Sequence, residues 1–210
     1  MSANSSAPSP DDGNIDARHW QRLLQRSKER GDCEGVVNAM RSGSKWPQVV
    51  ISGAKCIRAM SATGTAQTDI DFGRHGAIPV LVHGLEAHGE TNASVAEAGC
   101  GALRNLAHNN NDNKTTMGES GGIPLILRML EAHGETNASV AEAGCSTLRN
   151  LAHNNDDNKT TIGESGGISL IIRALEAHGE TNVSVAEAGC EVSPTTTTTK
   201  RPSESPVAFH

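Results

Sequence analysis

Polar residues that could serve binding or catalysis recur on what would be one face of a helix. Glu97, Arg104, Asn105 and His108 follow one another in steps of three and four around Gly101, and this spacing aligns them on a helix. The same face returns 45 residues later as Glu142, Ser146, Arg149, Asn150 and His153. Catalysis normally depends on one converged constellation, whereas every candidate here is multiplied by the repeat. We therefore expect a chain that is not an enzyme.

Histidine and cysteine also recur once per repeat, which bears on metal binding. The equivalent histidines are His88, His133 and His178, and the equivalent cysteines are Cys100, Cys145 and Cys190. Equivalent points on stacked helices lie roughly 8–10 Å apart. A zinc site needs about four ligands near 2 Å, and a disulfide needs Cα atoms within about 7 Å. We expect no metal, no cofactor and no disulfide, and interpret these cysteines as small buried hydrophobic residues.

The 45-residue period indicates how the chain is organised. The segment LEAHGETNASVAEAGC at 85–100 recurs at 130–145 and, with one change, at 175–190. Segments 76–120 and 121–165 are identical at 35 of 45 positions. A period in the forties is typical of repeats built from two or three helices. Because each such unit contacts only its neighbours, function would lie in the surface of the stack rather than in one pocket.

Three helices are predicted within each regular repeat. Asp112 or Asn113 would cap a short first helix, which stops at Gly121. The second helix would carry Pro124 in its first turn, where the missing N–H costs nothing. The third would run over about 137–152, with small and aliphatic residues at core spacing.

The order of these segments resembles the armadillo repeat. Asn-Lys-x-x-Ile/Met is followed by Gly-Gly-Ile-Pro-Leu-Ile and then by Val-Ala-Glu-Ala-Gly-Cys-x-x-Leu-Arg-Asn-Leu-Ala. The resemblance covers about 76–190 strongly and 17–75 weakly, and the Gly-Gly-Ile-Pro junction favours it over the two-helix HEAT repeat. It implies an all-α, armadillo-like solenoid of about 3.5 three-helix repeats, in which the third helices line a concave groove.

The predicted organisation has six segments. These are a disordered N-terminal segment 1–15, a divergent first repeat 16–75, regular repeats 76–120 and 121–165, a truncated repeat 166–190 and a low-complexity, disordered tail 191–210. The last third helix would end near Cys190 and leave the solenoid without the polar cap that such ends need. This favours a fragment of a longer array, and self-association through that end is an expectation of the same hypothesis.

The resemblance also implies which residues bind a partner. In armadillo proteins that bind extended peptides, the Asn of the Leu-x-Asn-Leu segment bonds the ligand main chain, which assigns this role to Asn105 and Asn150. The alternative is that these amides cap neighbouring turns or bond between adjacent third helices. Gly101 and Ser146 stand where nuclear-import adaptors of the family carry Trp, so classical basic import signals are not the expected ligands.

Charged residues beside these amides would select the ligand. The Glu row would favour basic ligands and the Arg row acidic ones, and the sequence leaves both open. The predicted partner-binding residues are Asn105, Asn150, Arg104, Arg149, Glu97, Glu142, His108 and His153.

Composition narrows the class of partner. A net charge of −6 speaks against nucleic acid, whose phosphates call for a basic surface. The N-terminus lacks a secretory signal and no apolar run is long enough for a membrane span, so we expect a cytoplasmic or nuclear protein. The first hypothesis is a non-catalytic scaffold that binds an extended peptide segment along the third helices. The second is a structural or regulatory part of a larger protein that acts by spacing or self-assembly.

Overall fold

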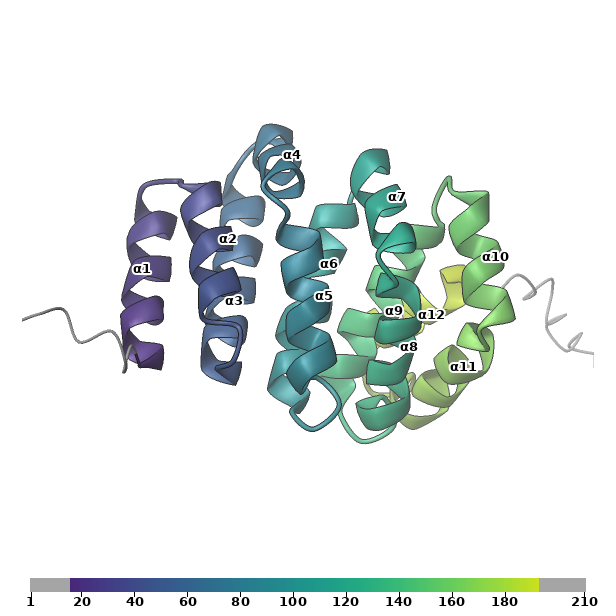
Figure 1. The fold of residues 1–210 in the computed structure, drawn as a ribbon. Coiled ribbons are helices and arrows are strands. Elements are labelled where there is room, and N and C mark those ends of the chain that lie inside the picture. The colour runs from purple at the N-terminus through teal and green to yellow at the C-terminus, as the bar shows by residue number, and fades with distance from the viewer. Residues whose placement is uncertain (1–15, 193–210) are drawn as a thin grey trace, which may run out of the picture.

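Helices make up the regular secondary structure of residues 16–192, the part of the chain that the computed structural model describes (Figure 1). They follow one another in four triplets. These are α1 (Ala17–Glu29), α2 (Cys33–Ser42) and α3 (Pro47–Thr63); α4 (Ala66–Arg74), α5 (Ala77–His88) and α6 (Ala93–Ala107); α7 (Asn111–Glu119), α8 (Gly122–His133) and α9 (Ala138–Ala152); and α10 (Asp156–Glu164), α11 (Gly167–His178) and α12 (Val183–Val192). The all-α fold and the three helices per unit are confirmed.

Asparagine side chains begin several of these helices. Asn92 and Asn137 accept hydrogen bonds from the backbone N–H groups two and three residues ahead, which opens α6 and α9. The predicted cap of α7 was wrong. Asn110 is the cap, in place of Asp112 or Asn113, because its side chain accepts the backbone N–H of Asn113 at 3.0 Å. The Asn113 side chain is consequently available for a contact with another repeat.

Glycine makes the sharp turn between the first and second helices of each regular unit. Gly76, Gly121 and Gly166 have φ angles of 81°, 75° and 77°. Glycine adopts this left-handed conformation without the steric cost that a side chain adds. The short first helix can thus turn directly into the second.

The third helices form one continuous side of the molecule. α3, α6, α9 and α12 pack on one another in order, more extensively than the second helices α5, α8 and α11 do. Figure 1 shows the second helices in front and the third helices behind them. Because the third helices approach one another more closely, their side is the inner side of the curve. Within a unit, Gly99 on α6 and Gly144 on α9 lie directly against the side chains of Leu85 on α5 and Leu130 on α8, so glycine lets the second and third helices pack closely.

The recurring histidines hold successive repeats together. Each one donates its Nε2–H to a backbone carbonyl 44 residues earlier, since a carbonyl can only accept. The bonds run from His88 to Ser44, from His133 to Gly89 and from His178 to Gly134, at 2.9, 2.8 and 3.0 Å. Among residues 16–187, whose side chains the structure describes, no group of three or more His, Cys, Asp or Glu side chains is placed to hold a metal ion.

Both ends of the predicted organisation reach past the described residues. α12 runs to Val192, two residues beyond the predicted boundary at 190. The predicted segments 1–15 and 191–210 otherwise lie outside the described residues. Within the described part, none of the helices has the length and apolar character needed to cross a membrane.

Candidate protein-interaction groove

A row of arginines follows the inner side of the stack. Arg104 on α6 and Arg149 on α9 were predicted there, and Arg58 on α3 takes the equivalent place in the first repeat. A Cβ on Gly101 would lie 3.1 Å from the Arg58 guanidinium. The position that holds Trp in import adaptors is therefore filled here by an arginine of the preceding third helix.

The arginines of the first two units line two adjoining cavities. One, of about 340 Å³, is bordered by Lys55, Arg58, Arg104 and Asn105. The other, of about 70 Å³, is bordered by both arginines together with Glu97 and Glu142. The Arg104 Nη1 and Glu142 Oε1 atoms are 3.5 Å apart, and both side chains are about one third exposed. Such an exposed pair adds little stability, but it places the Glu142 carboxylate beside a cation rather than leaving it open to a ligand.

The two predicted binding asparagines bond between adjacent third helices. Asn105 Nδ2 donates to the Arg58 carbonyl at 3.4 Å, and Asn150 Nδ2 donates to the Arg104 carbonyl at 3.0 Å. The alternative role foreseen for them is thus present in the structure. An amide has two N–H donors and one oxygen acceptor, so each retains chemical capacity for a second partner. Both side chains are partly exposed.

A third cavity, of about 250 Å³, lies between the C-terminal ends of α6 and α9. Its polar lining consists of His108, Asn109, Lys114, Arg149, Asn150 and His153. Four of these are predicted binding residues, so the repeat brings them together at one place. The C-terminal ends of α6 and α9 and the start of α7 meet there, each with a cationic or imidazole side chain, and no carboxylate lines the cavity. We call this cavity the Lys114 pocket.

Lys114 gives the pocket its electrostatic character. The residue is 3 % exposed, and its Nζ donates to the backbone carbonyl of His153 at 2.7 Å. Burial lowers the pKa of its ammonium group below the ordinary value, because the charged form loses hydration. A backbone carbonyl uses one of three ammonium donors, which leaves two for other partners.

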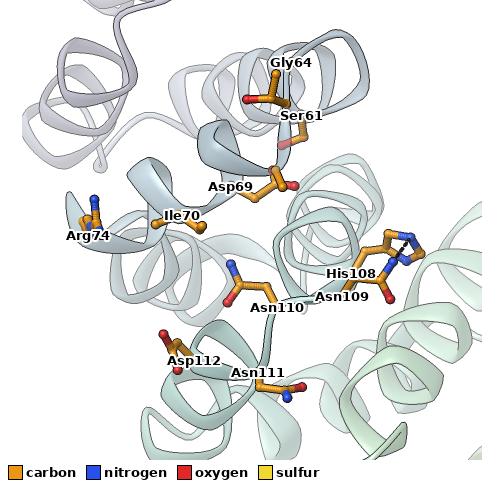
Figure 2. A pocket seen from close by; sticks show the side chains of 12 residues that line it. Ser61, Gly64, Asp69, Ile70, Arg74, His108, Asn109, Asn110, Asn111 and Asp112 are labelled. Atoms are coloured by element: carbon orange, nitrogen blue, oxygen red, sulfur yellow. Dashed lines mark hydrogen bonds between the residues drawn. The ribbon is translucent and has the colours of Figure 1, made fainter.

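The corresponding pocket one repeat earlier carries a carboxylate in place of the lysine. Asp69 on α4 stands 45 residues before Lys114 and lines a cavity of about 460 Å³ with Ser61 and His108. Figure 2 shows Asp69 close to Ser61, with His108 and Arg74 toward opposite ends of the pocket. The Asp69 Oδ1 and Ser61 Oγ atoms are buried without a hydrogen-bond partner in the described chain. Burial raises the pKa of the Asp69 carboxyl, and the nearby Ser61 and His108 act against that rise.

Three cations of the groove were missed in the sequence. Arg58 and Lys55 lie in the divergent repeat, and only the 46-residue offset between Met60 and Leu106 aligns Arg58 with Arg104. Lys114 lies in an Asn-rich segment that reads as a solvated helix cap, and nothing in its spacing signals burial. Whether any of these residues, or the eight predicted ones, touches a partner stays a prediction.

Comparison with known proteins agrees with this architecture. Residues 110–153 match the Armadillo/beta-catenin-like repeat. No curated protein sequence matches the chain.

Solved structures resemble more than four fifths of the chain. An engineered protein superimposes with a TM-score of 0.65 at 19 % identity, covering 82 % of this chain and 65 % of its own. A designed armadillo repeat protein in complex with the peptide (KR)4 gives 0.64 at 17 % identity, with 83 % and 71 % covered. A chain from work on a phosphorylation switch in the interaction between cadherin and beta-catenin gives 0.61 at 24 % identity, with 84 % and 30 % covered.

These similarities establish the fold. The ligands named with those structures are ligands of those proteins. The chain spans less than two thirds of the engineered protein and under one third of the chain from the cadherin and beta-catenin work. The described chain has the armadillo-repeat fold, and within it residues 110–153 are the segment that matches the Armadillo/beta-catenin-like repeat.

Proposed function

We propose that this chain is a non-catalytic protein-interaction module that binds an extended peptide segment along its third helices. The observation that carries the proposal is the regular placement of Asn105 and Asn150 on successive inner helices, each beside a cavity lined by charged side chains. Peptide groups repeat along an extended chain, so amides that repeat along a groove can bond them in register. The designed protein with the (KR)4 peptide and the cadherin and beta-catenin work provide precedents on this fold.

The surroundings of the groove favour a protein ligand inside a reducing compartment. Cys33, Cys56, Cys100 and Cys145 are buried free thiols, which suits the cytoplasm or the nucleus. The overall charge of −6 disfavours nucleic acid. The groove side chains recur once per repeat and do not converge on one reacting centre. We therefore propose a binding module and not an enzyme.

A peptide selection tests this function. Random twelve-residue peptides displayed on phage would be selected on the full chain, and enriched sequences would be synthesised and titrated by fluorescence anisotropy. We expect the Asn105→Ala/Asn150→Ala double variant to weaken binding by about tenfold or more, as loss of central contacts does. Circular dichroism would confirm that the variant is helical, because these amides also join adjacent helices.

The matched control changes the outer side. Arg128 on α8 and Arg173 on α11 are exposed and pair with Glu90 and Glu135 of the preceding units. The Arg128→Ala/Arg173→Ala variant should bind the selected peptides like the wild type. The proposed function would be contradicted if both double variants lost affinity for the selected peptides equally, or if the Asn105→Ala/Asn150→Ala variant lost none.

Self-association is the second candidate function, and a specific observation favours it. Ile172 and Val183 are the exposed large apolar side chains of the described residues, at 43 % and 72 % exposure, and both belong to the last unit. Leu127, the equivalent of Ile172 one repeat earlier, is 4 % exposed because α11 covers it. The last unit thus presents a face that the previous unit buries.

A further inference from the structure

We infer that the Lys114 pocket binds one anionic group, the carboxylate or phosphate of a side chain carried by the bound segment. The inference rests on the proposed function only for the carrier, since the pocket can be tested with a free anion. It deepens that function by assigning one charge to one position of the ligand.

The electrostatics of the pocket favour an anion. Lys114 is almost fully buried, yet within the described chain its ammonium group donates to the neutral carbonyl of His153 and to no carboxylate. The Arg149 guanidinium borders the same cavity, and no carboxylate does. Ionic interactions strengthen when water is excluded. An anion placed here would therefore compensate a cation that has already lost much of its hydration.

The fold itself does not require a lysine at this position. The equivalent residue of the preceding unit is Asp69, which cannot donate such a bond, and α3, α4 and α6 pack there as α6, α7 and α9 do around Lys114. The equivalent of the next unit, Lys159, is exposed and bonds the Asp156 carboxylate at 2.9 Å. Among these three positions, Lys114 is the one buried cation.

The size and the place of the pocket fit a side chain rather than a main chain. Its volume of about 250 Å³ accommodates a carboxylate or a phosphate with part of its stem. Asn150 lies at its border and also belongs to the predicted ladder of peptide-binding amides. A segment that bonds Asn150 would carry its neighbouring side chain past the pocket entrance.

Inorganic phosphate and acetate are the first probes. Each would be titrated into the full chain, labelled with ¹⁵N, at neutral pH and low salt, and followed by two-dimensional NMR. We expect saturable shifts centred on Lys114, His153 and Asn109. The Lys114→Met variant should weaken this binding by about tenfold or more, because it removes the buried charged donor.

The control is the lysine of the next unit. Lys159→Met removes the same charge from an exposed site and should leave the shifts and the affinity unchanged. Shifts that are equal around Lys114 and Lys159, or affinity that survives Lys114→Met, would overturn the inference. Since the wild-type shift map is read independently of any variant, a misfolded variant does not leave the question open.

Peptides then separate this inference from the proposed function. A groove-binding peptide would be made with Glu, phosphoserine or Gln at its acidic position. The inference is supported if the Gln peptide binds the wild type more weakly than the acidic peptides do, and if Lys114→Met binds the Gln and acidic peptides with equal affinity. The ratio of Glu to phosphoserine affinity in the wild type then identifies the preferred anion. Peptides that bind the groove equally with Gln overturn the inference and leave the function standing. If phosphate binds at Lys114 but no peptide binds the groove, the inference stands and the proposed function is contradicted.

Discussion

Cys100 and Cys145 show at the scale of single residues how far the interior excludes water. Both thiols lie on third helices, α6 and α9, and are fully buried, and burial raises the pKa of each to about 12. An unfolded chain would ionise the same thiols near the ordinary value of 9.0. Between these values the folded state holds more protons than the unfolded state, so stability falls as pH rises through this window.

Alkaline unfolding should therefore depend on these two residues. From about pH 9 upward, we expect the free energy of unfolding to drop by up to ~1.4 kcal/mol per pH unit for each thiol. Urea denaturation at a series of pH values, in wild type and in Cys100→Ala/Cys145→Ala, measures the difference. The double variant should be less stable at neutral pH but should lose less stability on going alkaline. Parallel pH profiles in the two proteins would show that the thiols do not carry the effect.

The short first helices are fixed by asparagines at the scale of elements. Asn158 Nδ2 donates to the Leu151 carbonyl at 3.2 Å and to the Lys114 carbonyl of the preceding first helix at 3.3 Å. Asn113 bonds the Leu106 and Asp69 carbonyls in the same way. These buried bonds leave no room at the end of the preceding first helix, where Gly118 faces the Asn158 side chain.

Two equivalent glycines should consequently respond with opposite signs. Gly163→Ala on α10 meets open space, so it should stabilise the chain by about 0.5 kcal/mol through helix propensity. Gly118→Ala on α7 would push against the Asn158 oxygen and should destabilise by about 1–3 kcal/mol. Thermal unfolding of both variants checks this. A Gly118→Ala protein as stable as Gly163→Ala would mean that the Asn158 bonds are dispensable.

The helices were predictable, and the contacts between repeats were largely not. Glycine and proline punctuation and the 3.6-residue period give each helix to within a few residues. The error at the start of α7 arose because several asparagines stand in a row, and local sequence does not say which one caps. The roles of Asn113, Lys114 and the recurring histidines depend on carbonyls about 40 residues away, so they follow from packing. Arg58 was hidden by the one-residue change in spacing.

Charge is distributed unevenly at the scale of the whole molecule. Residues 16–58 hold nine Lys or Arg against four Asp or Glu, whereas residues 156–192 hold two against seven. Arg18, Arg22 and Arg26 are exposed on α1, at the opposite end of the stack from α11 and α12 (Figure 1). The basic end of one copy is therefore complementary in charge to the acidic end of another copy. A head-to-tail contact would repeat and build open chains of molecules.

Such assembly should depend on both salt and the exposed apolar pair. At low salt, we expect the wild type to form assemblies whose size increases with protein concentration, as measured by sedimentation velocity. At about 1 M salt these assemblies should become smaller, because charges are then screened beyond about 3 Å. Ile172→Ser at the acidic end and Arg22→Glu/Arg26→Glu at the basic end should each give monomers, because the two ends form one contact. Mixing the two variants should restore pairs only, since one good face of each remains. A wild type that is monomeric at every concentration removes self-association and leaves the groove as the working surface.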